Sequence, residues 1–308
     1  MSVPAFPVYT LADLEIWSAP GTSLGLLGHP VAHSLSPAIH NAALAALAKQ
    51  DARFGAWRYS KFDIAPAELG RALKLFHQKG FVGLNLTVPH KEMAFEHAEV
   101  SDALASAASA TNTLIRTPTG WRASNTDSGG LADALRAELG VDLCGANVIL
   151  LGAGGAARAA AAQCLREKTT SLWIGNRGVE RLQALLDHLA PLAGNVPVRG
   201  FSLANPPPDL PAGSVVINTT SAGLKGDGSA PIDLRRIPAP GNVYDMIYNP
   251  PLTPLLTQAS ALGIPHAHGL GMLVNQGARS LSMWIERPAP LDVMTAAAHE
   301  AFAALSHA

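Results

Sequence analysis

Short apolar runs alternate along the chain with longer stretches in which apolar and polar positions mix. The apolar runs predict buried strands at residues 23–28, 83–87, 147–151, 171–174, 215–218 and 242–246, with another strand expected at 56–62. The mixed stretches predict helices at residues 36–47, 66–79, 103–110, 129–139 and 180–189, and one more starting near residue 91. Strands that alternate with helices are typical of an α/β fold with mostly parallel sheets.

The first 21 residues show neither pattern clearly. They are punctuated by Pro4, Pro7 and Pro20. We expect them to form a short extension, or a helix that packs outside the main fold.

Several hydroxyl side chains and one amine come directly after predicted strands. Ser34 and Ser36 lie in the loop after the first of these strands, and Thr87 and Lys91 follow the strand at residues 83–87. Because ligands of parallel α/β sheets bind at the carboxyl ends of strands, these side chains are candidates for a substrate site. Ser36 is also a plausible N-cap, since a proline follows it.

A glycine-rich turn directly follows the strand at residues 147–151. Gly152, Gly154 and Ala157 occupy the three small positions of the pattern G-x-G-x-x-A. The first glycine permits a tight turn, the second lets backbone approach a pyrophosphate, and the alanine lets helix and strand pack closely. Since a strand precedes the pattern and a helix follows it, the sequence predicts a dinucleotide site at the helix N-terminus.

The end of the next strand indicates which nucleotide binds. An NAD site usually has a carboxylate there for the ribose 2′-hydroxyl, whereas this chain has Asn176, Arg177 and Arg181. Guanidinium groups bind a phosphate bidentately, so the sequence favours NADP over NAD. The alternative is that both arginines are simply solvated near a helix start.

Composition narrows the class of protein. The chain has 308 residues, of which 48% are hydrophobic and 15% charged, which predicts two globular domains. The formal net charge of −1 gives no sign of nucleic-acid or membrane binding. Cys144 and Cys164 have no metal or redox spacing, and the chain shows neither a secretory signal nor an apolar run long enough to span a bilayer, so we expect a cytoplasmic protein.

Histidines are the remaining metal candidates. The spacings of His29, His33, His266 and His268 fit no zinc pattern. We therefore expect loop and core histidines, and no metal site.

Hydride transfer from a nicotinamide to a carbonyl needs a proton donor for the oxygen. Lys91 is one candidate, because an ammonium group can be desolvated and lowered in pKa. The alternative for Lys91 is an ordinary surface lysine at a helix start. Asp127 is the second candidate, and its alternative use is as the N-cap of the following helix.

Taken together, the motifs resemble those of the shikimate dehydrogenase family over roughly residues 24–284. They occur in the family's order, at residues 33–37 (HSLSP), 85–91 (NLTVPHK), 110–114 (ATNTL), 125–127 (NTD), 152–157 (GAGGAA), 218–223 (NTTSAG), 244–248 (YDMIY) and 269–274 (GLGMLV). The resemblance implies NADP-dependent, reversible reduction of 3-dehydroshikimate to shikimate in the chorismate pathway of aromatic amino acid biosynthesis.

The resemblance also implies roles for individual residues. Lys91 would be the acid/base, paired with Asp127. Ser34 and Ser36 would bind the substrate carboxylate. The other substrate-binding residues implied are Asn85, Thr87, Asn112, Tyr248 and Gln276. The cofactor-binding residues implied are Gly152, Ala153, Gly154, Gly155, Ala156, Asn176, Arg177, Arg181, Thr220, Met246, Gly269 and Met272.

Two positions depart from the family pattern. Ser128 stands where glycine is usual, and His268 stands where aspartate is usual. Quinate or an amino-analogue of shikimate is therefore an alternative substrate. A protein of another class, which senses NADP without turnover, is a further alternative, although such a protein needs neither Lys91 nor Asp127.

The implied architecture has two domains. Residues 1–126 and 269–308 would form a mostly parallel α/β substrate-binding and catalytic domain, to which the C-terminal helices return. Residues 127–268 would form a Rossmann-type NADP-binding domain. The expected partner is a small-molecule substrate, and the chain would be a monomer or a homodimer.

Overall fold

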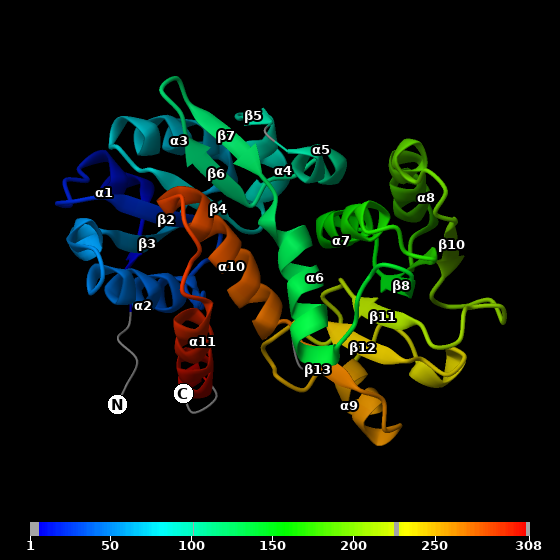
Figure 1. Ribbon diagram of the computed structural model, residues 1–308. Coiled ribbons are helices and arrows are strands. Elements are labelled where there is room, and N and C mark those ends of the chain that lie inside the picture. Colours follow the sequence, from blue (N-terminus) through cyan, green and yellow to red (C-terminus); the bar gives the residue numbers. More distant parts are fainter. Residues whose placement is uncertain (1–5, 101, 225–227, 306–308) are drawn as a thin grey trace. The chain divides into compact units, whose positions relative to one another are not determined.

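The computed structural model describes residues 6–100, 102–224 and 228–305. The chain divides into two compact units, one made of Met1–Thr126 with Leu273–Ala308 and the other of Asp127–Met272. Each unit holds its own sheet with helices packed on it, as Figure 1 shows. The predicted α/β fold is thereby confirmed.

The sheet of the first unit has the strand order β1-β3-β2-β4-β6-β7-β5. Its strands are β1 (Val8–Tyr9), β2 (Ser23–Gly28), β3 (Arg58–Asp63), β4 (Gly83–Leu86), β5 (Glu99–Val100), β6 (Thr113–Arg116) and β7 (Trp121–Ser124). The β4–β6 and β6–β7 pairs are antiparallel, and the remaining pairs are parallel.

Helices cover both faces of this sheet. They are α1 (Leu11–Glu15), α2 (Ser36–Ala48), α3 (Leu69–Gln78), α4 (His90–Phe95), α5 (Ala103–Ala108), α11 (Leu291–Leu305) and the greater part of α10 (Leu270–Ile285), with 3₁₀ turns η1 (Ala52–Ala56) and η2 (Pro66–Glu68). On one face, α1, α3 and α4 bury apolar side chains around Phe62, Phe76 and Phe81. On the other face, α2 and α11 lie side by side, and the Trp284 indole of α10 donates to the Leu114 carbonyl at 3.0 Å.

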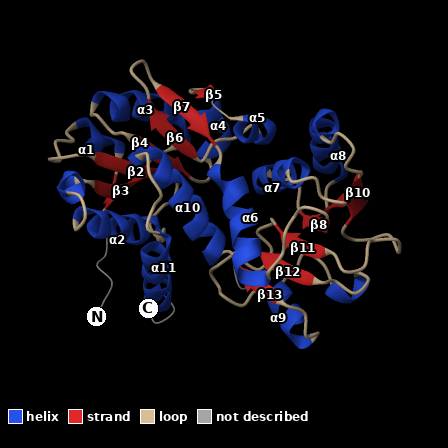
Figure 2. Ribbon diagram, viewed as in Figure 1, coloured by secondary structure: helices blue, strands red, loops and turns tan. Residues whose placement is uncertain are grey.

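The sheet of the second unit is entirely parallel, in the order β10-β9-β8-β11-β12-β13. Its strands are β8 (Asn147–Leu151), β9 (Ser171–Asn176), β10 (Val198–Ser202), β11 (Val215–Asn218), β12 (Asn242–Asp245) and β13 (His266–His268). Its helices are α6 (Thr126–Leu139), α7 (Gly155–Arg166), α8 (Val179–Leu189) and α9 (Pro254–Ala261), with 3₁₀ turns η3 (Ala190–Leu192) and η4 (Leu234–Arg236). One apolar core joins the sheet to α6, α7 and α8, and a second joins its other face to α9 and η4 (Figure 2).

The described part of the amino-terminal segment, from residue 6 on, belongs to the main fold, so the expectation of a helix outside it was wrong. Strand β1 pairs in parallel with β3 and extends the sheet. Helix α1 starts at a capping box formed by Thr10 and Asp13. Its Leu11 and Leu14 enter the same core as Phe76, because they supply the apolar face that a five-residue helix must bury.

The described part of the chain contains no helix that is both long and apolar enough to cross a membrane.

Candidate functional site

The loop after β2 carries the two serines predicted to bind a carboxylate. Helix α2 begins at Ser36, so Ser36 is not the N-cap that the sequence suggested. The Ser34 hydroxyl accepts from the Ser36 amide at 3.3 Å, which satisfies one of the amides at the helix start. Ser36 is buried and Ser34 is half-buried. The two serines therefore lie next to each other at the helix N-terminus.

The loop after β4 packs against this loop. The His29 amide donates to the Val88 carbonyl at 3.1 Å, and the Thr87 amide donates to the Leu27 carbonyl at 2.8 Å. A Cβ added at Gly28 would lie 2.3 Å from the Thr87 methyl group, so only glycine permits this approach. Thr87 is thereby held beside the serine loop, as the parallel β2–β4 pairing requires.

Asn85 is 3% exposed, and its amide is engaged on both sides within the protein. Its Oδ1 accepts from the Tyr59 hydroxyl at 2.8 Å. Its Nδ2 donates to the Asn112 carbonyl at 3.1 Å and to the Ser280 hydroxyl at 2.9 Å. A side chain with these bonds orders the neighbouring polar groups, a role that the sequence did not indicate.

Asn112 joins three segments of the first unit. Its Oδ1 accepts from the Thr126 amide at 2.7 Å, and its Nδ2 donates to the Thr126 hydroxyl at 2.8 Å and to Gln276 Oε1 at 3.1 Å. Asn112 and Gln276 are both buried, at 1% and 9% exposure. Two residues predicted to bind substrate hydroxyls, 164 positions apart in sequence, are therefore in direct contact.

A buried aromatic pair supports the start of α2. The His40 ring stacks on Tyr59 at 4.0 Å between centroids, and His40 Nδ1 lies 2.9 Å from the Ser36 carbonyl oxygen. Since a carbonyl only accepts, Nδ1 carries the proton. Burial lowers the pKa of His40 to about 4 and raises the pKa of Tyr59. His40 is consequently neutral in the folded protein near pH 7.

Lys91 lies in the first turn of α4 and is half-buried. Its carbonyl accepts from the Thr111 amide at 2.9 Å, which fixes α4 against the segment that contains Asn112. Asp127 lies within the first turn of α6, which begins one residue earlier, so Asp127 is not an N-cap. Lys91 belongs to the first unit and Asp127 to the second, and their pairing stays a prediction.

The glycine turn of the second unit opens a cavity of about 300 Å³. Gly152 has a φ of +118°, and a Cβ there would lie 2.5 Å from Thr219 Oγ1, so both the backbone conformation and the space demand glycine. Gly154 is the N-cap of α7, and a Cβ there would meet no described protein atom within 4 Å. The helix start thus offers open space to a ligand, as a phosphate site requires.

Three polar side chains stand on the wall of this cavity next to the end of β9. Asn176, Arg177 and Arg181 all line it, and both arginines are exposed. Asn176 Nδ2 donates to the Gly178 carbonyl at 2.9 Å, which shapes the turn into α8. Among the described residues that line the cavity, none is acidic. The cavity therefore suits an anion beside the ribose end of a dinucleotide.

A buried polar network positions the end of β11. Asp245 is fully buried and accepts from Asn218 Nδ2 at 2.9 Å and from the Thr253 hydroxyl at 2.7 Å. Asn218 Oδ1 in turn accepts from the Thr220 amide at 2.9 Å and its hydroxyl at 2.8 Å. Burial raises the pKa of Asp245 by more than the hydrogen bonds that it accepts lower it, so the pKa lies above its usual value. Thr220, a predicted cofactor residue, is held in the cavity wall by this chain of bonds.

The start of α10 meets the end of β12. A Cβ added at Gly269 would lie 2.0 Å from the Met246 carbonyl oxygen, so the two predicted cofactor residues are in close contact. The Met272 amide donates to the Tyr244 hydroxyl at 3.2 Å. Tyr248 follows the same strand and is half-buried, and burial raises the pKa of its hydroxyl.

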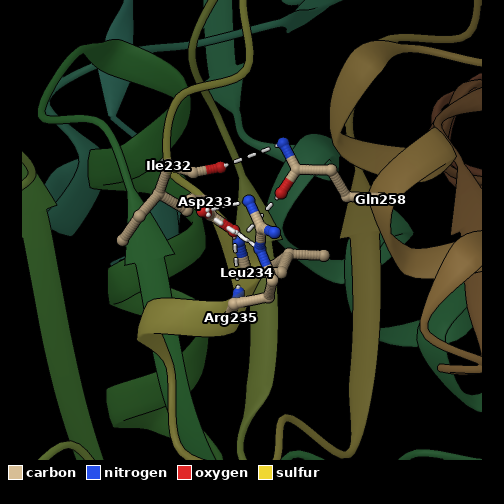
Figure 3. Close-up of polar contacts among 5 residues, drawn as sticks. All are labelled: Ile232, Asp233, Leu234, Arg235 and Gln258. Atoms are coloured by element: carbon tan, nitrogen blue, oxygen red, sulfur yellow. Dashed lines mark hydrogen bonds and ion pairs between the residues drawn. The ribbon is translucent and has the colours of Figure 1, made fainter.

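Other residues line the cavity without having been predicted. These are Leu203, Thr219, Ser221, Ala222, Ser229, Ala230 and Pro231. The segment that follows Pro231 is anchored as Figure 3 shows. Asp233 accepts from the Arg235 amide at 3.0 Å, and Gln258 Oε1 accepts from the Leu234 amide at 2.9 Å. The anchoring by α9 fixes this side of the cavity, and no local motif in the sequence signals it.

Both departures from the family pattern have a structural use. The Ser128 hydroxyl donates to the Ala159 carbonyl at 3.0 Å, which links α6 to α7. His268 Nδ1 accepts from the Leu270 amide at 3.3 Å at the start of α10. An aspartate oxygen could accept in the same way, so His268 keeps a hydrogen bond that the usual aspartate could also make. Within the described ranges, no group of three or more metal-ligating side chains could hold a metal ion.

Comparison with known proteins identifies the family. Residues 26–114 match the shikimate dehydrogenase substrate binding domain, and residues 269–299 match the shikimate 5′-dehydrogenase C-terminal domain. The shikimate dehydrogenase (NADP(+)) of Symbiobacterium thermophilum is 39% identical over 286 residues, which cover 91% of this chain and 94% of that relative. The chain belongs to the shikimate dehydrogenase family. The predicted family is thereby confirmed.

Solved structures of similar fold include a member of this family. Shikimate 5-dehydrogenase from Thermus thermophilus, in complex with NADP(H) and shikimate, is 33% identical with a TM-score of 0.78, covering 91% of this chain and 99% of that one. The ligand-free 5-ketofructose reductase of a Gluconobacter species is 28% identical with the same TM-score of 0.78, covering 92% and 99%. Relatives with this fold therefore include reductases of different substrates.

Proposed function

We propose that this protein catalyses the NADP-dependent, reversible reduction of 3-dehydroshikimate to shikimate. The observation that carries the proposal is the cavity of the second unit, where the glycine turn at Gly152 and Gly154 shares a wall with Arg177 and Arg181 and no described lining residue is acidic. Family membership adds the substrate class. The shikimate dehydrogenase of Thermus thermophilus binds NADP(H) and shikimate on the same fold.

NADP fits the residues present. The open space at Gly154 and the start of α7 suit the pyrophosphate, and the guanidinium groups of Arg177 and Arg181 suit the 2′-phosphate. Thr220, Met246, Gly269 and Met272 are the proposed contacts of the nicotinamide half. When bound, NADPH supplies the hydride for the substrate carbonyl.

The first unit supplies the substrate groups. Ser34 and Ser36 would bind the carboxylate through their hydroxyls at the start of α2. Asn112 and Gln276, already in contact at 3.1 Å, would bind ring hydroxyls, with Thr87 beside them. Asn85 is a further proposed substrate contact, and Tyr59, Ser280 and the Asn112 backbone hold its amide in place. Tyr248 is the proposed contact from the second unit.

Lys91 is the proposed acid/base. Its ammonium would donate a proton to the carbonyl oxygen as that oxygen becomes an alkoxide. The neutral amine left by this step would take the proton from the hydroxyl in the oxidation of shikimate. Asp127 is its proposed partner, whose carboxylate would accept a hydrogen bond from Lys91. The negative charge in the first turn of α6 is also favourable to that helix.

The cellular setting follows from the same proposal. We place the enzyme in the cytoplasm, where thiols stay reduced, because Cys144 and Cys164 are both unpaired and Cys144 is exposed. The partner would be the small-molecule substrate, with the chain acting as a monomer or a homodimer.

The test is a set of initial rates with purified protein. NADP reduction is followed with shikimate and with quinate, and both are repeated with NAD. The proposal requires shikimate with NADP to have the highest kcat/KM. Tight NADP binding without turnover of either acid would instead favour a sensor.

A further inference from the structure

Lys61 is a buried cation that the catalytic proposal does not use. It lies in β3 with 6% of its surface exposed, and burial lowers the pKa of its amine. Its Nζ donates to the Ala32 carbonyl at 2.5 Å. Among the described residues, no carboxylate forms an ion pair with it, although an ammonium group can donate three hydrogen bonds. Burying a charge without a counter-charge is costly, so the position calls for an explanation.

The location of Lys61 explains why a lysine is buried there. Lys61 is paired in register with Leu26 of β2, two residues before that strand ends at Gly28. Its carbonyl partner, Ala32, lies in the loop that leaves this strand, two residues before Ser34 and four before Ser36. The ammonium therefore holds the loop that carries both candidate carboxylate ligands.

A second residue of β3 holds the same loop. Asp63, two positions along the strand from Lys61, pairs with His29 at 2.5 Å between Oδ1 and Nδ1. The Ile64 amide donates to the Gly28 carbonyl at 3.1 Å. The carboxylate of Asp63 is therefore directed to His29, and among the described contacts it forms no ion pair with Lys61.

We propose that Lys61 is a positioning and charge-selecting residue for substrate, which fixes the serine loop through Ala32 and whose positive charge favours an anionic group bound by Ser34 and Ser36. This inference rests on the proposed function, because that function places a carboxylate in the loop. The carboxylate would supply the counter-charge that Lys61 lacks within the protein. A neutral ligand of the same shape would gain nothing from the charge.

The experiment compares an acid with its neutral ester. Binding of shikimate and of methyl shikimate to the NADPH-saturated protein, in which the reduced cofactor cannot accept a hydride from shikimate, is measured by calorimetry for wild type, Lys61→Met, Lys61→Gln and Lys61→Arg. Lys61→Gln keeps a hydrogen-bond donor for the Ala32 carbonyl but removes the charge. This variant tests the effect of the charge if the methionine variant does not fold. Lys74→Met, which removes an exposed lysine from α3, is the matched control.

Both neutral variants should weaken shikimate binding by about tenfold or more, the effect of losing a nearby charge. Binding of the methyl ester should change by less than about threefold, and Lys61→Arg should remain close to wild type. KM for shikimate should rise in the same proportion, while kcat and the Kd for NADP stay unchanged. A merely structural lysine would not separate acid from ester in this way.

Two results would overturn the inference. One is unchanged shikimate binding in both neutral variants, and the other is an equal loss for acid and ester. Wild-type protein that binds NADP but no shikimate would overturn the proposed function and this inference with it. If wild type binds shikimate and the variants do not discriminate, only the inference about Lys61 fails.

Discussion

The arginines at the end of β9 provide a prediction whose size can be worked out. Arg177 and Arg181 line the cavity of the second unit and are both exposed. A hydrogen bond to a charged group contributes about 1.5–3 kcal/mol. Because both guanidinium groups are exposed to solvent and salt, we take the lower end, about 1.5 kcal/mol for each, which corresponds to roughly tenfold in Kd. Arg177→Ala and Arg181→Ala should each weaken NADP binding by about that factor.

The assay is calorimetric titration of each variant with NADP and with NAD. The Kd for NAD should change by less than about twofold, because NAD has no 2′-phosphate for the guanidinium groups to bind. The affinity of the double variant for NADP should fall by up to about 100-fold, and by less if both arginines act on the same phosphate. These losses of NADP affinity should become smaller as the salt concentration is raised. Arg166→Ala, which removes an exposed arginine from the far end of α7, is the control.

Equal weakening of NADP binding and NAD binding by either variant would show that the arginines act on something other than the 2′-phosphate. Unchanged NADP binding in the double variant would show that neither arginine binds the 2′-phosphate.

Three further predictions concern catalysis, the glycine turn and pH. Lys91→Ala should lower kcat by about 10²–10⁴ with KM nearly unchanged, and a near-normal kcat in steady-state assays would count against an acid/base role. Gly152→Ala should abolish NADP binding, because its Cβ would lie 2.5 Å from a threonine hydroxyl, whereas Gly194→Ala, also at a positive φ but outside the cavity, should lower Tm and leave the Kd for NADP unchanged. His40 has a folded pKa of about 4, below its unfolded value, so it contributes stability above pH 6.5 that is lost as pH falls toward 4. The unfolding free energy of wild type should therefore drop by up to about 3 kcal/mol more than that of His40→Gln over this window, and parallel pH profiles in urea would contradict this.

Local signals in the sequence were sufficient for the cofactor cavity. The glycine turn, Asn176 and the two arginines lie within 30 residues, and a strand–turn–helix unit fixes their relation. The part of the cavity lining from Ser229 to Pro231 depends on contacts of η4 with α9 and could not be predicted in this way.

Strand β10 was not predicted, for a related reason. It contains Gly200 and lies at the edge of the sheet, and glycine inside a strand pattern argues against a strand. The structure shows why the glycine is there, since a Cβ would lie 2.7 Å from Leu186 of α8. Strand β13 is a three-residue edge strand, too short to leave a pattern.

Polar residues of the first unit show what the sequence can and cannot tell. Asn85 was predicted to bind substrate because it belongs to a motif, and the sequence did not indicate that its amide also bonds to Tyr59 and Ser280, which are distant in sequence. Lys61 gave no signal, because a lysine in a strand reads as a solvent-facing residue. Only the three-dimensional register with β2 reveals that its ammonium lies under the serine loop.

The decisive measurement is the initial rate of NADP reduction with shikimate, compared with the rates for quinate and for NAD. A shikimate dehydrogenase should show the highest kcat/KM with shikimate and NADP, and Lys91→Ala should remove nearly all of this rate. Preference for quinate or for NAD would contradict this prediction, as would NADP binding with no turnover of either acid.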